Sequence, residues 1–342
     1  MQSSPPENNR TRATRSVTLD DVAKLAGVSP ITVSRVLNHP DKVAVKTLEK
    51  VQKAIALTGY VPNMLAGGLA SKRSRLIAAI VPSIANSVYA ETIKFFSERM
   101  RDAGYQVLLG ESGHKQEQEE SLIATILRSR PDGIFLTGIN HSPQAKKMLF
   151  AANIPVVETW DITPTPLDVV VGFSHQDVGR AVAEYFVDKV FERIGILSAE
   201  DHRAQLRQQS FLKVLERKGK TDVSISTVPV PTSFLAGRIG MARLLDEGFI
   251  DGAVFSSSDT LAQGALAEIQ SRGLEIPRQI ALVGFGDQPY AAHTVPPLTT
   301  VKFDRALIGQ KAADALISRF NNEKFDQKIV DVGFQLIERQ TT

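Results

Sequence analysis

Apolar residues near the beginning of the chain recur at helical spacing in short stretches separated by glycine. In the stretch 18–38 they lie on both sides of Gly27, a residue that can end a helix in the left-handed conformation. Thr18 suits the N-cap of a first helix, and Ser29-Pro30 suits the beginning of a second. Apolar residues in 46–58 repeat with the same period. The pattern predicts a helix-turn-helix followed by a third helix.

From residue 76 onward, short apolar runs alternate with helical stretches. We expect strands at 76–81, 106–109, 133–136, 155–158, 169–171, 194–197, 223–228, 253–255 and 280–283. We expect helices between them at 89–103, 116–130, 143–152, 176–190, 204–218, 233–247, 260–272 and 304–320. The alternation predicts an α/β fold of two doubly wound parallel-sheet subdomains, with a ligand cleft at the carboxyl ends of the strands.

Charge is distributed unevenly along the chain. The net charge is +3, but residues 1–75 hold twelve Lys and Arg against five Asp and Glu, so this part carries +7 and the remainder carries −4. A basic head on a mildly acidic body favours DNA binding at one end. For the run 42–53 alone, a solvated lysine-rich face is the alternative explanation.

Composition excludes several classes of protein and of site. The chain has no cysteine, which excludes disulfides, thiolate catalysis and cysteine-ligated metal. It has no run of eighteen apolar residues, and its first fifteen residues contain no apolar signal region. We therefore expect a cytoplasmic protein that neither spans a membrane nor is exported.

The second helix of the helix-turn-helix carries the chemistry that favours DNA. A capped helical hairpin by itself is common in proteins with other functions. Once the valines and the leucine of this helix face the core, the residues left outside are Pro30, Ile31, Ser34 and Arg35. A short polar side chain beside an arginine suits contacts to bases and phosphates.

No catalytic or metal-binding pattern is found. Glu158 and Asp161 lie in one short loop rather than facing each other across a bond, as a glycosidase pair must. The segment VGFGDQ lacks the third glycine of a dinucleotide loop. The six histidines have no metal-ligand spacing, and we expect each at the surface or as a cap. We expect that the protein is not an enzyme and binds no cofactor or metal. A sugar-acid enzyme and a solute-binding protein are the alternative functions.

Long segments of the chain resemble the lactose/galactose repressor family of bacterial transcription regulators. They include VTLDDVAKLAGVSPITVSRVLN, VAVKTLEKVQKAIALTGYVPN, LAGGLASKRS, DGAVFSSSDTLAQGAL and IPRQIALVGFGD. The segments GYQVLLGESGHKQEQEES and IPVVETWDITPTPLDVVVGF are most similar to gluconate-operon repressors within that family. The resemblance implies a periplasmic-binding-protein-like core behind the headpiece, a fold that agrees with the strand and helix pattern.

The resemblance also implies which residues bind DNA. Pro30 and Ile31 match positions that read operator bases in the major groove. The full set of expected DNA-binding residues is Thr18, Leu19, Ser29, Pro30, Ile31, Thr32, Ser34, Arg35, Asn38, Tyr60, Asn63, Ala66 and Leu69. Leu69, together with Ala66, matches the leucine that the family wedges into the minor groove, where it kinks the duplex; packing against its own dimer mate is the alternative for Leu69.

A second set of residues is expected to bind a small-molecule effector. Arg207 matches the basic position that holds the effector, and its guanidinium suits a carboxylate. The full set is Ser87, Tyr89, Glu158, Trp160, Asp161, Phe173, Arg207, Ser258, Asp259 and Asp287. Gly286 stands where many sugar-binding relatives carry an Asp, and this favours an anionic effector such as gluconate. For Glu158 and Asp161, capping of a helix or loop is the alternative.

Together these observations predict the domain organisation and the partners. We expect a disordered arm at 1–16, a helix-turn-helix headpiece at 17–62, a hinge helix and linker at 63–75, a core N-subdomain at 76–172 plus 303–333, and a core C-subdomain at 173–302 plus 334–342. Gly67-Gly68 weakens the hinge helix, because each interior Gly costs up to ~1 kcal/mol relative to Ala. We expect a homodimer on a pseudo-palindromic double-stranded operator, with gluconate or a related sugar acid as effector.

Overall fold

The structure is a computed structural model that describes residues 16–61, 73–323 and 327–342. It divides into two compact units, Met1–Ser74 and Arg75–Thr342, each treated separately below. Most of the expected arm and hinge, with Asn63, Ala66 and Leu69, lies outside the described residues.

The first unit is a headpiece of three short α-helices. They are α1 (Leu19–Ala26), α2 (Pro30–Asn38) and α3 (Val45–Thr58), with a 3-10 turn at Pro40–Lys42. The predicted caps are confirmed: Thr18 and Asp21 form a reciprocal capping box, and Ser29 caps α2 ahead of Pro30. Gly27 has φ +66°, the left-handed conformation that ends α1. Small apolar side chains from all three helices form one core: Val22, Ala23, Val33, Val36, Val51 and Ala54.

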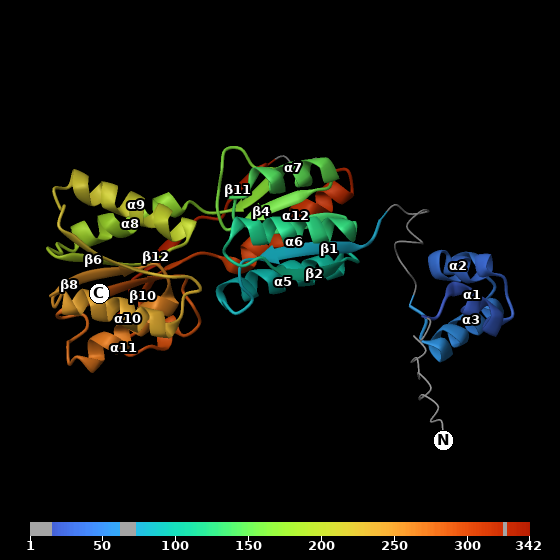
Figure 1. Ribbon diagram of the computed structural model, residues 1–342, viewed down its shortest axis with the longest axis horizontal. Helices are drawn as coiled ribbons and strands as arrows, with labels where there is room; N and C mark the ends of the chain where they lie inside the picture. The colour runs from blue at the N-terminus through green and yellow to red at the C-terminus, as the bar shows by residue number, and fades with distance from the viewer. Residues whose placement is uncertain (1–15, 62–72, 324–326) are drawn as a thin grey trace, which may run out of the picture. The chain divides into compact units, whose positions relative to one another are not determined.

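The second unit contains two six-stranded sheets (Figure 1). The first has the order β11-β5-β4-β3-β1-β2, with β1 (Leu76–Val81), β2 (Gln106–Glu111), β3 (Gly133–Thr137), β4 (Val156–Thr159), β5 (Val169–Gly172) and β11 (Ile329–Asp331). The second has the order β12-β10-β9-β8-β6-β7, with β6 (Ile194–Ala199), β7 (Val223–Val228), β8 (Gly252–Ser256), β9 (Ile280–Phe285), β10 (Thr299–Lys302) and β12 (Gln335–Ile337). All printed pairings are parallel except β10 with β12.

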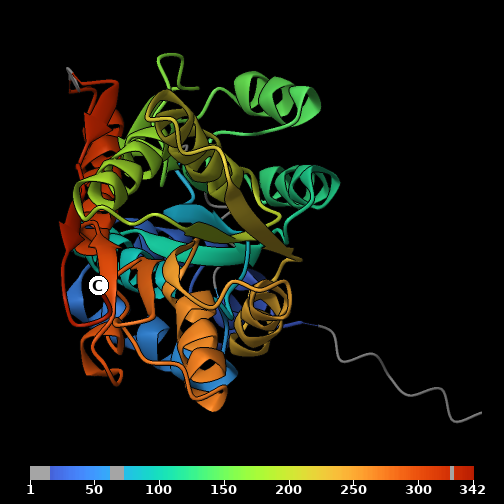
Figure 2. The ribbon, with the colours of Figure 1, turned by 90° about the vertical axis from the view of Figure 1, so that its left-hand side faces the viewer.

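Helices cover both faces of each sheet. The first sheet lies between α5 (Val88–Asp102) with α12 (Arg305–Phe320) and α6 (Gln116–Arg128) with α7 (Pro143–Ala152). The second lies between α8 (His175–Asp188) with α9 (His202–Arg217) and α10 (Phe234–Asp246) with α11 (Asp259–Ser271), as Figure 2 shows. The central strands, such as β1 and β9, are apolar on both sides, as buried parallel strands must be, whereas edge strands β2 and β7 are more exposed. We call these two layered halves the first and second subdomains.

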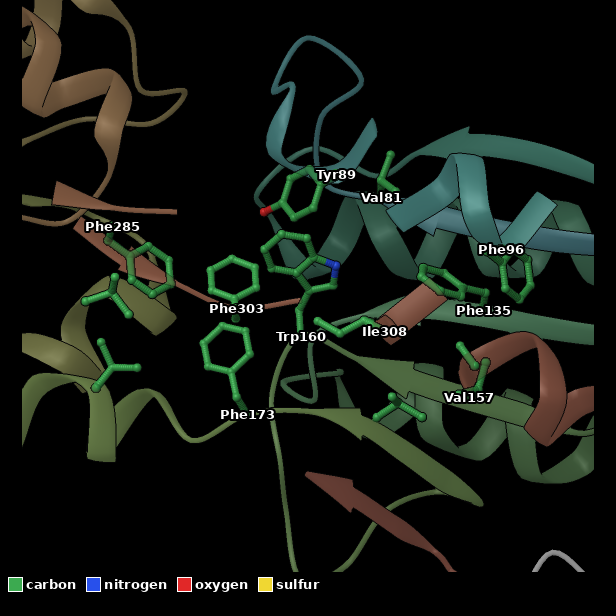
Figure 3. Close-up of a cluster of buried hydrophobic side chains, with 14 of the residues drawn as sticks. Val81, Tyr89, Phe96, Phe135, Val157, Trp160, Phe173, Phe285, Phe303 and Ile308 are labelled. Atoms are coloured by element: carbon green, nitrogen blue, oxygen red, sulfur yellow. The ribbon is translucent and has the colours of Figure 1, made fainter. Parts of the chain in front are cut away.

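The chain passes between the two subdomains three times. It crosses from β5 to α8, returns from β10 to α12, and crosses again from β11 to β12. Aromatic rings gather at these crossovers, where Phe173 stacks on Phe303 with centroids 4.4 Å apart and Trp160 packs edge-on against Phe303 at 5.1 Å (Figure 3). One buried apolar cluster is therefore continuous through both subdomains.

The predicted strands and helices of the core are confirmed, with ends that differ by up to two residues. The sequence pattern does not predict β10, β11 and β12, because β11 and β12 are edge strands of only three residues and β10, Thr-Thr-Val-Lys, has no apolar run. Within the described ranges, no helix combines the length and apolarity needed to span a bilayer.

Candidate functional sites

The outer face of α2 is the first candidate site. Ile31 is 71% exposed although it is apolar, and Ser29, Pro30, Arg35 and Asn38 are also exposed. Val33 and Val36 are buried beneath it, as predicted. This face therefore combines a flat apolar contact with an arginine, a pairing suited to the methyl groups and phosphates of a DNA major groove.

Polar groups on this face are held by local hydrogen bonds. The amide of Asn38 donates to the carbonyl oxygen of Ser34 at 2.9 Å, and the hydroxyls of Ser29 and Thr32 lie 2.9 Å apart. The other expected contacts also have structural roles: Thr18 caps α1, while Leu19 and Tyr60 pack partly against the headpiece core. The structure thus presents a preformed surface with its side chains restrained.

The second candidate site is a cavity of about 310 Å³ lined by residues of both subdomains. Ser87, Tyr89 and Trp160 come from the first subdomain, and Arg207, Ser258 and Asp259 come from the second. The cavity lies beyond the carboxyl ends of β1, β4, β6, β8 and β9, the usual ligand position in sheets of this kind. These six are the predicted effector residues that the structure brings together.

Four predicted effector residues do not line this cavity. Phe173 is fully buried against Phe303. Glu158 is buried within β4, where it accepts a hydrogen bond from the Leu167 amide at 2.7 Å. Asp287 accepts a hydrogen bond from Nη2 of Arg339 at 2.7 Å. Asp161 lines a neighbouring, smaller cavity. Phe173, Glu158 and Asp287 are engaged elsewhere, whereas Asp161 keeps one buried carboxylate oxygen without a hydrogen-bond partner. None of the four lines the larger cavity.

Two arginines dominate the cavity chemistry. Arg207 is only 4% exposed; its Nη1 donates to His175 Nδ1 at 2.8 Å, and its Nη2 donates to the carbonyl oxygen of Ser257 at 2.9 Å. Arg203 donates to the Tyr89 hydroxyl at 2.6 Å. None of these three partners carries a negative charge. Neither arginine is hydrogen-bonded to a carboxylate in the described part of the chain, and Asp201 and Asp161 interact with both cations through charge alone.

Arg207 stays charged at neutral pH. Burial lowers its pKa to about 10; the carboxylates of Asp201 and Asp161 act against this change, and the charge of Arg203 acts with it. Its guanidinium carbon lies 3.9 Å from the centroid of the Phe285 ring, and this stacking gives the cation a favourable neighbour.

The acidic groups of the cavity are already hydrogen-bonded within the protein. Asp259 accepts hydrogen bonds from the Thr300 hydroxyl at 2.5 Å and from the Gln288 amide at 2.7 Å. Burial raises the pKa of Asp259 to about 6. Asp201 accepts from the Ala204 amide at 2.9 Å and caps α9. These hydrogen bonds hold the two carboxylates in the cavity wall, and Asp201 also stabilises the charged form of Arg207.

Sequence reasoning missed several cavity residues, of which His175 and Arg203 matter most. The expectation that every histidine is a surface or capping residue is wrong for His175 and His141, which are 2% and 5% exposed. Arg203 lies one helical turn before Arg207 on α9, so the spacing of two arginines on one helix face was the available signal. His175 follows Ser174 at the first crossover, and nothing in the local sequence distinguishes it from a cap.

The smaller neighbouring cavity contains a buried histidine between two glutamates. His141 Nδ1 lies 2.9 Å from Glu119 Oε2, and its Nε2 lies 3.5 Å from Glu158 Oε1. Burial alone would lower the pKa of His141, but hydrogen bonds to the two carboxylates outweigh it and raise the pKa to about 9. His141 is therefore a protonated link between α6, β4 and the beginning of α7.

We expect the free energy of unfolding to fall as the pH rises from about 6.5 to about 9. The folded protein holds the His141 proton more tightly than the unfolded chain, whose pKa is near 6.5. This stabilisation, on the order of 3 kcal/mol, is fully present below the unfolded pKa and is lost as the pH rises through the folded one. Urea unfolding across this range measures it, and His141→Gln should have a flatter profile. An equally steep profile for that variant would assign the effect to other groups.

Comparison with known proteins identifies the family. A model of the bacterial regulatory proteins of the lacI family matches residues 18–63, and a model of the periplasmic binding protein-like domain matches residues 183–342. The regulator GntR of Pseudomonas aeruginosa is 36% identical over 338 residues, which cover 98% of this chain and 98% of that protein. The chain belongs to the LacI family.

Solved LacI-family structures have the same architecture. A LacI-family regulator from Silicibacter pomeroyi has a TM-score of 0.88 and 32% identity, with 95% of this chain and 99% of that chain covered. The lac repressor dimer bound to operator and the anti-inducer ONPF has a TM-score of 0.80 and 29% identity, with 96% and 99% covered. The predicted family and fold are confirmed. As a LacI-family member the chain is a DNA-binding transcriptional repressor, and the relatives are named as regulators, not enzymes.

Proposed function

We propose that this repressor controls a sugar-acid catabolic operon and that gluconate, or a close relative of it, binds in the cavity and switches the affinity for operator DNA. The observation that carries the proposal is the pair of cavity arginines, Arg203 and Arg207, whose hydrogen-bond partners are uncharged. A fork-shaped guanidinium matches a carboxylate, and the remaining cavity wall offers hydroxyl and amide groups for a polyol. Relatives named GntR in Pseudomonas aeruginosa and Escherichia coli, at 36% and 33% identity, support it.

The glycine at position 286 favours an anionic effector, because it adds no charge to the cavity. A side chain at this position would project toward Asp259 and Gln288, both of which line the cavity. An Asp at this position, as in many sugar-binding relatives, would place another negative charge beside the ligand. Glycine leaves the arginines as the dominant charge.

Switching requires that the effector bind two states of the repressor unequally. The cavity is lined from both subdomains, so a ligand can favour one arrangement of the subdomains over another. We propose that the effector favours the arrangement in which the paired hinges separate and the operator is released.

Isothermal calorimetry with D-gluconate, 2-ketogluconate and 6-phosphogluconate tests the effector class. We expect at least one of the three to bind the full-length protein. Binding of a neutral sugar with none of these acids would overturn the anionic proposal and leave a repressor of a different sugar operon.

For DNA, we propose that the α2 face enters the major groove. Pro30 and Ile31 would contact bases through apolar surface, with Ser34 and Arg35 beside them. The proposed contacts also include Thr18, Leu19, Ser29, Thr32, Asn38 and Tyr60, and, from the sequence resemblance, Asn63, Ala66 and Leu69. Because Pro30 and Ile31 offer no amide, much of the sequence specificity would come from apolar contact, Arg35 and DNA deformation at the operator centre.

An Arg35→Ala variant should bind operator about tenfold or more weakly than the unmodified repressor. Arg35 is exposed on the α2 face and has no packing role there, so the headpiece should keep its stability. If Arg35 contacts phosphate, the slope of log affinity against log salt should fall by about one for each headpiece bound. Fluorescence anisotropy across a salt series measures both effects, with Arg73→Ala as a basic control outside α2. Equal affinities of the two variants would contradict the assignment.

We propose that two copies of the chain form a homodimer through the outer edges of the core sheets. Edge strand β2 exposes Leu108 and Leu109, each 45% exposed, and edge strand β7 exposes Ile225. The adjacent α10 exposes Phe234, Leu235 and Ile239. Exposed apolar side chains on both edge strands and a flanking helix are typical of a protein interface, and the lac repressor structure is itself a dimer. A dimer would present two headpieces to the half-sites of a palindromic operator.

Leu235→Glu should convert the dimer to monomer at micromolar concentration. Leu235 is 63% exposed on α10, so a charge there is tolerated by the isolated chain but is buried unpaired in the interface. Analytical ultracentrifugation measures the change, and Ile250→Glu, beyond the end of α10, is a matched control for an added exposed charge. A Leu235→Glu variant that stays dimeric would place the interface elsewhere.

A further inference from the structure

His175 joins the two subdomains at the wall of the cavity. It is the first residue of α8, in the second subdomain, and it is 2% exposed. Its Nε2 lies 2.8 Å from the carbonyl oxygen of Trp160, in the first subdomain, and its Nδ1 lies 2.8 Å from Nη1 of Arg207. One imidazole therefore contacts the central cation of the cavity and the backbone of the opposite half.

Only one protonation state of the ring satisfies both contacts. A guanidinium can only donate a hydrogen bond and a carbonyl oxygen can only accept one. Nδ1 must therefore be unprotonated and Nε2 must carry the hydrogen, so the ring is neutral. Burial, together with the charges of Arg207 and Arg203, lowers the pKa of His175 well below 6.5 and maintains this state.

The surroundings leave the ring little freedom to reorient. His175 packs edge-on against Phe173 at 4.8 Å and lies 5.9 Å from Phe285, whose ring also supports the Arg207 guanidinium. On the other side of Arg207, Nη2 is held by the carbonyl oxygen of Ser257 at 2.9 Å. The guanidinium is therefore fixed at both terminal nitrogens, and His175 supplies one of the two anchors.

The Trp160 end of the connection is equally constrained. Trp160 has φ +70°, a conformation that non-glycine residues rarely adopt, and its indole lies edge-on between Tyr89 at 5.0 Å and Phe303 at 5.1 Å (Figure 3). Tyr89 in turn accepts the hydrogen bond of Arg203. A displacement at His175 therefore reaches a rigid aromatic group of the first subdomain.

We propose that His175 is a positioning residue that orients Arg207 for the effector and transmits the movement of Arg207 to Trp160 across the subdomain boundary. The proposal rests on the proposed function, in which Arg207 holds the effector carboxylate. Because the imidazole accepts from Arg207 and donates to Trp160 through opposite sides of one rigid ring, a ligand that pulls the guanidinium also pulls the first subdomain.

Two substitutions separate the two hydrogen bonds. His175→Asn places its Oδ1 near the position of Nδ1, so it keeps the acceptor for Arg207 and loses the donor to Trp160. His175→Gln places its amide near Nε2, so it keeps the donor to Trp160 and loses the acceptor. We expect His175→Gln to lose at least tenfold more gluconate affinity than His175→Asn in calorimetry. For His175→Asn, the gluconate affinity measured by calorimetry predicts a concentration that should release a given fraction of operator duplex. We expect the concentration actually needed to be at least tenfold higher.

Equal losses in both variants, in affinity and in thermal stability alike, would show that His175 only fills space and would overturn the proposal. A spectroscopic test does not depend on the identity of the effector. In the ligand-free, full-length protein labelled with ¹⁵N-histidine, the His175 resonances are assigned by their absence in His175→Asn. They should show a neutral Nε2–H tautomer at pH 6.5, the ordinary pKa of a histidine.

A charged ring or the Nδ1–H tautomer would overturn the proposal even if gluconate binds. If the unmodified protein binds none of the three sugar acids while the tautomer is as expected, the effector assignment is wrong and the connection between Arg207, His175 and Trp160 still stands. The two failures are therefore distinguishable.

Discussion

An Arg207→Met repressor should bind gluconate more than 100-fold more weakly and should remain on its operator at effector concentrations that release the unmodified protein. The expected loss is on the order of 100-fold or more because Arg207 is a buried, hydrogen-bonded cation, and removal of one partner of such a contact costs about 2–5 kcal/mol. The headpiece is a separate unit with its own core, so operator binding without effector should persist.

Arg207→Lys is the matched control. Lysine keeps the charge but has no fork of donors, and it cannot reach His175 and Ser257 together as the guanidinium does. We expect an intermediate loss of about tenfold. Calorimetry and operator anisotropy, measured on all three proteins, give effector affinity and DNA release separately. Arg207→Met with undiminished gluconate binding would show that Arg207 does not hold the effector.

Gly264→Ala should destabilise the core by about 2–3 kcal/mol. Helices α10 and α11 approach so closely that a Cβ at Gly264 would lie 2.1 Å from the carbonyl oxygen of Phe234 and 2.8 Å from the Arg238 amide nitrogen. These are backbone atoms of the facing helix, so the helices must separate to admit one methyl group. Gly237 makes the reciprocal contact with Leu261.

The test is whether Gly264→Ala lowers or raises the free energy of unfolding. In the interior of a helix, Ala is favoured over Gly by up to about 1 kcal/mol, so a Gly264→Ala variant without the clash would be stabilised. Urea unfolding followed by far-UV circular dichroism measures the change. A neutral or stabilised variant would show that the two helices are not in backbone contact at this position.

The elements that could be predicted from the sequence are those whose cause is local. The helix at 143–152 and the strand at 223–228 have the predicted ends, since a cap marks the first and an alternation of apolar with small polar residues marks the second. The headpiece was predicted in the same way, from Thr18, Gly27 and Ser29. Helical periodicity also indicated which side of α2 faces outward.

The cavity could be predicted only in part, because its chemistry depends on pairs of residues far apart in sequence. Arg207 was predicted from the resemblance, but its partner His175 lies 32 positions earlier and its other partner Ser257 lies 50 positions later. Phe173 was expected in the pocket, yet its ring stacks on Phe303, a contact across 130 positions that no local pattern reveals. Side-chain direction at a strand end is set by such distant packing.

The three crossovers determine the order in which the protein can fold during synthesis. The covering layer of the first sheet needs α12, which ends at Phe320, and the sheet itself needs β11, which ends at Asp331, so almost the whole chain must leave the ribosome first. The second sheet is complete a few residues later, once β12 has also left the ribosome. The headpiece, in contrast, closes its core within residues 19–60 and can fold while most of the chain is still unmade. The headpiece of a nascent repressor can therefore fold long before the cavity of the core is complete.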